Sequence, residues 1–388
     1  MAIRRNLAPT LKELARSYPV VTVTGPRQSG KTTLARMSFR HHAYVSLEPL
    51  DTRSYAREDP RGFLAEYKSG AVIDEVQNAP EILSYLQQVV DEDPTPGRWI
   101  LTGSQHFGLL QSVTQSLAGR TGVLHLLPLS FDEVRRFDDP PTDLLTTLWI
   151  GGYPRIHDQR LNAARWLTDY VTTYVQRDVR QILNVGDLEA FTTFVRLSAG
   201  RTATELNLSA LGSDAGVSHN TARAWLSALE ASFIFFRVPP WRRSHRKQLI
   251  KAPKIHFFDS GLVCSLLGIT QPEQLRHHPL RGQVFESWVA SEVHKHRTHR
   301  GYPPALSHYR DSKGLEVDLV LEGAQGLSAI EAKSGSTLAT DATTPLQRFA
   351  SAASDPITGF VVHGGEERRR IHGIDALPWS QIQRQDWR

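Results

Sequence analysis

One segment decides the fold of the amino-terminal region: Gly25-Pro26-Arg27-Gln28-Ser29-Gly30-Lys31-Thr32. It fits the pattern G-x-x-x-x-G-K-[ST], whose glycines let the backbone bend so that N–H groups face phosphates. The β-branched run Val20–Thr24 precedes it, and a helical pattern over Thr32–Met37 follows. This strand–loop–helix context indicates a phosphate-binding loop rather than a chance glycine turn. We predict that Gly25–Thr33 bind ATP, with Lys31 on the β- and γ-phosphates and Thr32 on Mg²⁺.

Further strand patterns follow this loop and alternate with helical ones. They are Ala43–Leu47, Ala71–Ile73, Trp99–Thr102 and Gly122–Leu127. Short apolar strands separated by helices indicate a parallel sheet covered on both faces. The chain has 388 residues, enough for two or three domains. The predicted fold class is therefore α/β, with a P-loop parallel-sheet ATPase domain over residues 1–140.

Polar residues follow two of these strands. Asp74 and Glu75 come directly after Ala71–Ile73, where hydrolysis needs a carboxylate beside the metal and a group that orients water. We expect Asp74 to support Mg²⁺ and Glu75 to polarise the attacking water. The next strand ends with Thr102 and Ser104, either of which is a candidate to sense the γ-phosphate; a simple strand-ending turn is the alternative.

Arg120, in Leu117-Ala118-Gly119-Arg120, has two interpretations of equal weight. It acts as an arginine finger that a neighbouring subunit supplies to the ATP site, or it is an ordinary solvated arginine. The first interpretation requires a homo-oligomer.

The region 141–270 is mainly helical and holds a helix-turn-helix pattern over Leu206–Leu229. Gly216-Val217-Ser218 forms the bend, and Ser218 can cap the second helix. Helical spacing buries Ala222, Trp225, Leu226 and Leu229, which leaves His219, Asn220 and Arg223 on the other face. That face suits a DNA groove, although such turns often serve only packing.

Basic residues follow this helix, and no acidic residue lies between Glu230 and Asp259. Basic side chains with aromatic neighbours favour phosphate contact and base stacking, while a solvated loop or one bound to the protein's own acidic surface is the alternative. The basic residues are Arg237, Arg242, Arg243, Arg246, Lys247, Lys251 and Lys254, with Trp241 and His245 among them.

The region 271–388 holds three carboxylates and a lysine in a recognisable order. Glu286 lies in a helical pattern over Val284–His294, Asp318 lies in a strand pattern, and Glu331-Ala332-Lys333 ends the next strand. Alternation puts Glu331 and Lys333 on one face. We expect Asp318 and Glu331 to bind Mg²⁺ and Lys333 to orient or deprotonate the nucleophile. The order resembles the PD-(D/E)XK nuclease fold, with Glu286 as its helix acid.

The whole chain resembles a known group of ATPases. Thr24–Thr33, Val72–Glu75 and Leu101–Gln105, ending in Leu127-Pro128-Leu129-Ser130-Phe131, are similar to bacterial and archaeal AAA+-type ATPases, in particular the branch that carries a C-terminal domain of unknown function. Later stretches match that domain: Gly151-Gly152-Tyr153-Pro154, Tyr174-Val175-Gln176-Arg177-Asp178, Leu229–Phe233 and Lys254–Gly261. The resemblance implies an ATPase fused to a winged helix and a nuclease-like fold. The sequence departs from ring-forming relatives because it shows no separate lid domain with an obvious second arginine sensor.

Composition indicates the cellular compartment and the kinds of partner expected for this protein. A single cysteine, Cys264, excludes a disulfide scaffold and a cysteine-rich zinc site, and favours the reducing cytoplasm. No run of eighteen apolar residues occurs, so no membrane partner is expected. The net charge of +5 weakly favours a polyanionic partner.

These observations predict a cytoplasmic, Mg²⁺-dependent ATPase coupled to the processing of duplex or branched DNA, with a metal-dependent nuclease-like domain. Two alternatives stay open at this point. One is an ATP-driven remodeller that migrates DNA branches, and the other is a nucleotide-switched DNA-binding sensor whose nuclease fold is inactive.

Overall fold

The computed structural model describes residues 2–104, 116–175, 187–241, 252–323, 326–353 and 356–388. These residues form two compact units. Unit 1 comprises 1–129 with the short segments 231–233 and 298–301, and unit 2 comprises the remainder. The sequence places one boundary near residue 140 and another near 270, and both positions fall inside unit 2, which begins at Ser130.

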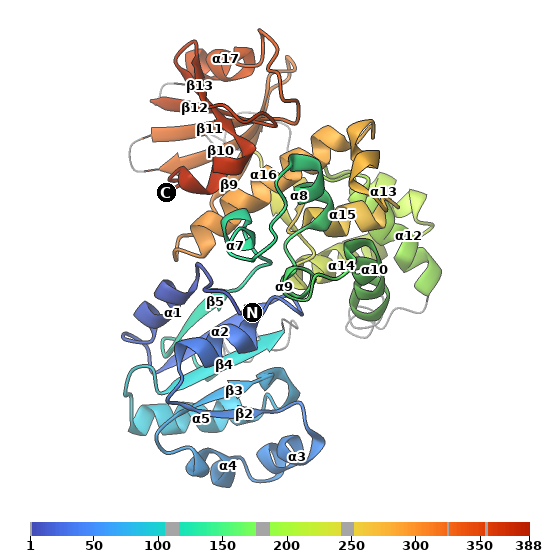
Figure 1. The fold of residues 1–388 in the computed structure, drawn as a ribbon. Helices are drawn as coiled ribbons and strands as arrows, with labels where there is room; N and C mark the ends of the chain where they lie inside the picture. Colours follow the sequence, from blue (N-terminus) through green and yellow to red (C-terminus); the bar gives the residue numbers. More distant parts are fainter. Residues whose placement is uncertain (1, 105–115, 176–186, 242–251, 324–325, 354–355) are drawn as a thin grey trace. The chain divides into compact units, whose positions relative to one another are not determined.

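Unit 1 is built on a five-stranded sheet in the order β2-β3-β4-β1-β5, in which every neighbouring pair is parallel. Each strand predicted from sequence is present (Figure 1). The strands are β1 (Val20–Gly25), β2 (Ala43–Ser46), β3 (Ala71–Asp74), β4 (Trp99–Ser104) and β5 (Thr121–His125). The helices are α1 (Ala8–Leu14), α2 (Lys31–Ser38), α3 (Leu50–Glu58), α4 (Pro60–Glu66) and α5 (Ile82–Glu92), with a 3₁₀ turn η1 at Val76–Asn78.

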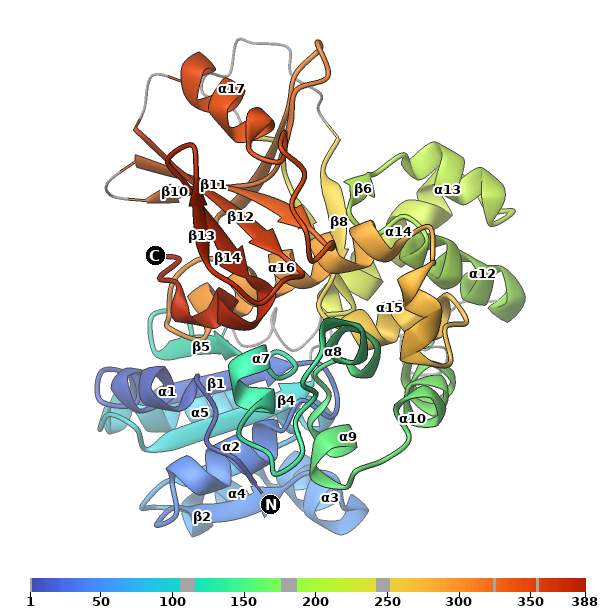
Figure 2. The ribbon, with the colours of Figure 1, turned by 45° about the horizontal axis from the view of Figure 1, so that its top comes forward.

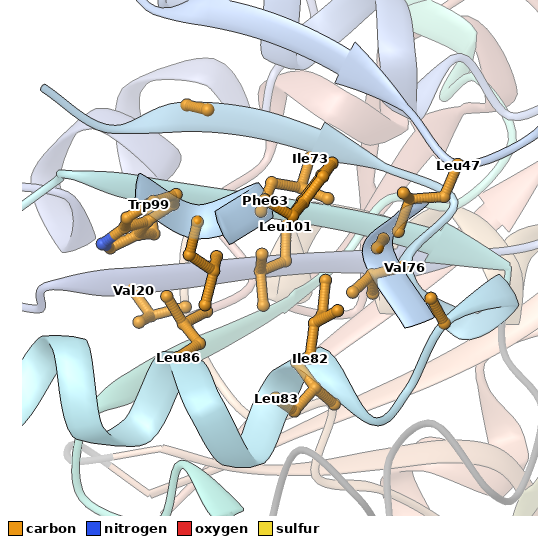
Figure 3. Packing of buried hydrophobic residues seen from close by; sticks show 14 of the residues in the cluster. Val20, Leu47, Phe63, Ile73, Val76, Ile82, Leu83, Leu86, Trp99 and Leu101 are labelled. Atoms are coloured by element: carbon orange, nitrogen blue, oxygen red, sulfur yellow. The ribbon is translucent and has the colours of Figure 1, made fainter. Parts of the chain in front are cut away.

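Helices cover both faces of this sheet, as alternation along the strands requires. Val21 and Val23 of β1 pack with residues of α1 and α2 on one face. Val20, together with Trp99 and Leu101 of β4, packs with residues of α3, α4 and α5 on the other, and Figure 3 shows this second cluster. Burial on both faces explains why these strands are apolar runs rather than alternating ones, and it fixes the strand ends that carry the polar residues.

Unit 2 contains a three-stranded and a six-stranded sheet (Figure 2). The smaller sheet has the order β6-β8-β7, from β6 (Thr204–Glu205), β7 (Phe235–Val238) and β8 (Lys254–Phe257). Its neighbouring helices in the sequence are α12 (Leu188–Ala199), α13 (Leu208–Asp214) and α14 (His219–Ala231). The remaining helices before the larger sheet are α7 (Phe131–Val134), α8 (Leu144–Ile150), α9 (Pro154–Asp158), α10 (Ala163–Tyr170), α15 (Ser260–Leu266) and α16 (Arg281–Thr298), with the π-helical turn η2 (Val171–Val175) and the 3₁₀ turn η3 (Pro272–Arg276).

The larger sheet has the order β13-β14-β12-β11-β10-β9 and mixes parallel with antiparallel pairs. Leu346 and Phe349 of α17 (Thr344–Ala352) pack against apolar residues of this sheet. The strands are β9 (Leu306–Arg310), β10 (Glu316–Gly323), β11 (Gly326–Lys333), β12 (Ile357–His363), β13 (Arg369–Ile371) and β14 (Ile374–Pro378), and the 3₁₀ turn η4 (Trp379–Arg384) follows them. The two strands expected around Asp318 and Glu331 are thus adjacent, antiparallel neighbours.

Two stretches that carry the family resemblance, Gly151–Pro154 and Lys254–Gly261, interlock inside unit 2. The buried Asp259 carboxylate accepts hydrogen bonds from the backbone N–H groups of Gly152 (2.6 Å) and Leu262 (2.8 Å), and so caps α15. Gly151 has a φ of +68°, and a Cβ there would lie 2.3 Å from an Asp259 oxygen. These residues therefore have a packing role.

Replacing Asp259 by alanine is expected to lower the free energy of unfolding of unit 2 by about 2–4 kcal/mol, because it removes a helix cap and leaves a buried N–H without a partner. Urea denaturation measures this change. The control is Asp143→Ala, which removes the exposed cap of α8, where the carboxylate accepts from the Thr146 N–H at 2.9 Å. That control should cost about 1 kcal/mol. Equal losses in the two variants would contradict the role given to Asp259.

Candidate functional sites

The first candidate site is the loop between β1 and α2. Gly25 has a φ of +148°, and a Cβ there would lie 2.2 Å from the Leu126 carbonyl oxygen. Gly30, with a φ of +92°, directly precedes α2. The Ser29 hydroxyl is buried and has no hydrogen-bond partner. A loop that only glycine can follow, with an orphaned buried hydroxyl at a helix N-terminus, fits a bound phosphate chain.

Lys31 lies buried at the start of α2. Its ammonium donates to the carbonyl oxygens of Gly25 (3.1 Å) and Pro26 (2.8 Å), which belong to the same loop. Burial lowers the pKa of Lys31 to about 8, although the nearby Glu75 and Asp74 carboxylates oppose this shift. A buried cation that neutral carbonyls hold is well placed to take phosphate oxygens as stronger partners.

Three hydroxyls converge on Asp74 at the end of β3. Thr32 donates to both carboxylate oxygens, at 2.9 and 3.0 Å, and Thr102 of β4 donates to one of them. Tyr44 of β2 donates to the other at 3.0 Å. Thr32 and Asp74 are the pair through which P-loop proteins hold Mg²⁺, so the donor set fits that ion. The sequence analysis missed Tyr44, which the order β2-β3 brings beside Asp74.

A second polar network links β3 to β4. Ser104 accepts a hydrogen bond from the Gln77 side-chain amide at 3.1 Å and donates to Glu75 at 3.4 Å. Gln77 also donates to Glu75, whose backbone has a φ of +57°. The predicted water-orienting Glu75 and γ-phosphate sensor Ser104 are therefore in contact. Gln77, which joins them, was missed because no sequence pattern marks it.

The other predicted loop residues differ in exposure. Arg27 and Gln28 are exposed in the loop. Thr33 lines a cavity of about 510 Å³ with Arg36 and Tyr44. Thr32 lines the same cavity, and Thr33 is exposed.

Arg120 lies at the other end of the sheet. It precedes β5, whose first residue Thr121 pairs with Val20, the first residue of β1, whereas the loop follows the last residue of β1. Its guanidinium forms an exposed ion pair with Asp91 at 2.5 Å. Arg120 is thus separated by the length of β1 from the phosphate loop of its own chain, and the arginine-finger interpretation stays a prediction for a neighbouring subunit.

The lowered pKa of Lys31 predicts that nucleotide affinity falls in alkaline solution. Below about pH 8 the free protein already carries the ammonium that phosphates need. Above that pH, binding must take up a proton, so the dissociation constant rises by up to roughly tenfold per pH unit. Fluorescence titration with an ATP analogue between pH 7 and 9.5 measures it. Lys31→Met should show weaker, flat affinity, and a wild-type curve as flat would contradict the prediction.

The second candidate site is a cavity of about 600 Å³ in unit 2. Glu286 of α16, Asp318 of β10 and Lys333 of β11 line it. Glu331 lies next to it, and its carboxylate accepts from the Lys333 ammonium at 2.6 Å. The expected placement of Glu331 and Lys333 on one face of the strand is confirmed by this contact.

Asp318 and Glu331 are both buried at this site. One Asp318 oxygen accepts from the Ala332 backbone N–H at 2.8 Å, which ties β10 to the end of β11. Glu331 is 5% exposed, and its second oxygen, Oε2, has no hydrogen-bond partner. Burial and the nearby Asp318 raise the pKa of Glu331 to about 8, and burial raises that of Asp318. The orphaned oxygen leaves Glu331 with capacity for a further partner.

A lysine that the sequence analysis assigned to the basic segment lies among these acids. The Lys254 ammonium contacts Glu286 at 2.8 Å, Glu316 at 2.6 Å and Asp318 at 3.8 Å, and the residue is 2% exposed. Burial alone would lower the pKa of Lys254, but the carboxylates outweigh it and raise that pKa. Burial and Asp318 raise the pKa of Glu286 despite this lysine. In the described part of the chain, four carboxylates (Glu286, Glu316, Asp318 and Glu331) share two ammonium groups, Lys254 and Lys333.

The predicted groove-reading helix is α14. His219, Asn220 and Arg223 are exposed, whereas Ala222, Trp225, Leu226 and Leu229 are buried, as the helical spacing predicts. The Ser218 hydroxyl accepts from the Thr221 N–H at 3.1 Å, which is the expected cap.

The basic segment needs correction at two residues. Trp241 is 7% exposed and its indole N–H donates to Glu322 at 2.9 Å, so it is not available to stack on a base. Lys254 is buried among carboxylates. Arg237 is exposed and pairs with Glu230. Arg242, Arg243, Arg246, Lys247, Lys251 and His245 lie outside the described residues.

The described residues hold no preformed group of three or more His, Cys, Asp or Glu side chains with the arrangement of a metal centre. Among the helices in the described ranges, none combines the length and the apolar character needed to cross a membrane.

Comparison with known protein families matches the chain in three parts. Residues 17–135 match a model described as an AAA domain. Residues 141–273 and 281–382 match two models described as domains of unknown function, DUF8612 and DUF4143.

Two curated relatives and several solved structures are similar to this chain. Uncharacterized proteins of Mycobacterium bovis and Mycobacterium tuberculosis are each 29% identical over 328 residues, which cover 82% of this chain and 71% of each relative. A Walker-type ATPase of Pyrococcus abyssi is 14% identical with a TM-score of 0.47, over 69% of this chain and 96% of that one. RuvB of Thermotoga maritima is 18% identical with a TM-score of 0.31, over 60% of this chain and 89% of that one.

TM-scores below 0.5 do not establish a shared fold. The amino-terminal domain is therefore described from its own sequence and structure and from the matching family model. The glycine loop after β1, the parallel sheet and the match over residues 17–135 agree with one another. Residues 17–135 thus match an AAA domain and carry a P-loop sequence on a parallel α/β sheet.

Proposed function

We propose that this protein is a Mg²⁺-dependent ATPase coupled to DNA processing, with a metal-dependent nuclease-like domain in unit 2. One observation carries the proposal: the chain builds two separate sites suited to phosphates. One is the loop around Lys31, and the other is the cavity that Asp318 and Lys333 line beside Glu331.

ATP hydrolysis is the reaction proposed for unit 1. Lys31 exchanges its carbonyl partners for phosphate oxygens. Thr32 and Asp74 would hold the Mg²⁺ that accompanies the nucleotide. Bound Mg²⁺ supplies charge neutralisation at the phosphates. Glu75 accepts hydrogen bonds from Gln77 and Ser104 and orients the attacking water. Ser104, in contact with Glu75, senses whether the γ-phosphate is present.

Phosphodiester cleavage is the reaction proposed for unit 2. The helix α16, the antiparallel pair β10–β11 and the parallel strand β12 follow the order expected of a PD-(D/E)XK nuclease. Asp318 and Glu331 offer carboxylate oxygens, the ligands that Mg²⁺ prefers. A bound divalent cation supplies the charge that the four carboxylates lack. Lys333, on the cavity wall, orients the nucleophile.

DNA contact is proposed for α14 and its surroundings. The order α12, β6, α13, α14, β7, β8 with sheet order β6-β8-β7 supports a winged helix, in which α14 is the recognition helix. Its exposed His219, Asn220 and Arg223 would read the groove of duplex or branched DNA, and the basic segment before β8 would contact phosphates.

The experiment is a panel of linear duplex, single-stranded and branched DNA incubated with the protein and Mg²⁺, with and without ATP. The proposal expects cleavage of at least one duplex or branched DNA and stimulation of phosphate release by that DNA. DNA that is bound but never cut would leave only the ATPase half. Branch migration without cleavage would point instead to a remodeller.

A second candidate, a nucleotide-switched DNA-binding sensor with a silent nuclease fold, has one observation in its favour. The Lys254 ammonium already contacts Glu286 and Glu316 and lies 3.8 Å from Asp318, one of the two carboxylates proposed to bind the metal. The same panel separates the two candidates, because the sensor shifts DNA in a nucleotide-dependent manner and leaves every substrate intact.

A further inference from the structure

We infer that Lys254 is a built-in counterion that occupies the point where Glu286, Glu316 and Asp318 converge, and that a divalent cation must displace it to load the site. The inference rests on the proposed metal site. Lys254, on the three-stranded sheet, then controls when the carboxylates of unit 2 bind a cation and which cation they bind.

The first argument is steric. The ammonium lies 2.8 Å from Glu286 Oε1 and 2.6 Å from Glu316 Oε1, with Asp318 Oδ1 at 3.8 Å. Mg²⁺ binds carboxylate oxygens at about 2.0–2.1 Å and demands near-octahedral geometry. An ion that takes Asp318 Oδ1 together with Glu286 Oε1 or Glu316 Oε1 would share the space of the lysine nitrogen. The ammonium and a cation at these oxygens therefore exclude one another.

The second argument is the position of Lys254 in the fold. Lys254 begins β8, the middle strand of the small sheet, and pairs there with Glu205 of β6 and Val238 of β7. Its backbone is thus fixed from both sides. A neighbouring bond ties the same strand to the helix that carries Glu286, because the Phe257 N–H donates to Ser287 at 2.9 Å, and Figure 2 shows β8 beside α16. The sheet therefore fixes the point from which the Lys254 side chain reaches the carboxylates.

The third argument is the room for release. Lys254 itself lines the cavity of about 600 Å³, together with Arg310 and Lys333. A rotation of its side chain would carry the ammonium from the carboxylates into that space. There it would face any phosphodiester that Lys333 contacts, so that release of the lysine both vacates the oxygens and adds a cation for the substrate. DNA and metal would then bind cooperatively.

An oxygen without a partner supports competition rather than absence of metal binding. Glu331 keeps such an oxygen even with Lys254 and Lys333 in place. That oxygen is still open to a dication. The lysine weakens its binding without abolishing it.

The test is a Mn²⁺ titration followed by electron paramagnetic resonance, with no nucleotide present. Lys254→Met keeps the length of the stem and removes the charge, and it should bind Mn²⁺ at least tenfold more tightly than the wild type. Mn²⁺ should also raise its melting temperature more than that of the wild type. Lys313→Met, an exposed lysine in the turn between β9 and β10, is the charge-matched control and should leave the affinity unchanged.

A measurement on the wild type covers the case in which the variant fails to fold. Amine labelling followed by mass spectrometry should modify Lys254 slowly in the absence of a divalent cation and several-fold faster with saturating Mg²⁺. Unchanged labelling, or Mn²⁺ affinity in Lys254→Met that equals or falls below that of the wild type, would overturn the inference. Loss of the proposed metal site is distinguishable, because Asp318→Asn would then leave Mn²⁺ binding unaltered in both backgrounds.

Discussion

Replacing Lys31 by alanine is expected to reduce ATP hydrolysis by at least about 100-fold. The buried ammonium is held by the carbonyl oxygens of Gly25 and Pro26 and is the cation nearest the phosphate path at the start of α2. Donors that are held in place where charge develops are worth a factor of this size. Phosphate release at saturating ATP and Mg²⁺ measures the loss.

The control for this prediction is Lys68→Ala, which removes an exposed lysine from the same unit. Both variants should melt within a few degrees of the wild type, since alanine is a good helix former at position 31. Turnover by Lys31→Ala within a few-fold of the wild type would mean that this loop is not the hydrolytic site.

Replacing Asp318 by asparagine is expected to reduce Mg²⁺-dependent DNA cleavage by at least about 100-fold while ATP hydrolysis continues. The substitution keeps the shape of the side chain but removes a charge that the cation needs, and metal assistance supplies several kcal/mol of transition-state stabilisation. The hydrogen bond from the Ala332 N–H can persist with the amide oxygen, so the β10–β11 pair should survive. Gel analysis of a labelled duplex and phosphate release, on one preparation, measure both activities.

Asp375→Asn on β14 of the same sheet is the matched control, because that carboxylate pairs with Arg368 at 3.1 Å and does not line the cavity. It should cleave as the wild type does. Cleavage that persists in Asp318→Asn would place the activity elsewhere, and loss of ATP hydrolysis together with cleavage would show that the two sites are not separate.

Sequence predicted what local patterns encode. The P-loop is a contiguous pattern between a strand and a helix, and the apolar strands of unit 1 are runs because both faces of the sheet are buried. Along α14, helical spacing separates the buried Trp225 from the exposed Arg223 because only one face of the helix is buried. Each of these features depends on residues a few positions apart.

Sequence failed where chemistry depends on elements far apart in the chain. Lys254 stands among basic residues, and only the register of β8 and its closeness to α16 bring it onto Glu286. Trp241 looked like an exposed aromatic, yet it packs against Tyr309 and Phe349. All four residues of the strand that Lys254 begins are buried, and the basic composition around it concealed this.

Tyr44 and Gln77 illustrate a related limit in unit 1. Both belong to the polar network around Asp74 and Glu75. The strand order β2-β3-β4 brings Tyr44 to Asp74 and Ser104 to Gln77, which lies only two residues after Glu75. A strand order is a property of the whole sheet. When a residue joins a site from a neighbouring strand, its spacing in the sequence does not indicate that contact.

The number of divalent cations bound per chain tests the central claim, that two distinct phosphate-handling sites coexist, most directly. Mn²⁺ binding at saturation, with a non-hydrolysable ATP analogue present, is counted for the wild type and for Asp318→Asn. The account predicts one nucleotide-dependent ion in both proteins and at least one further, weaker ion that only the wild type binds. Equal counts in the two proteins would contradict it.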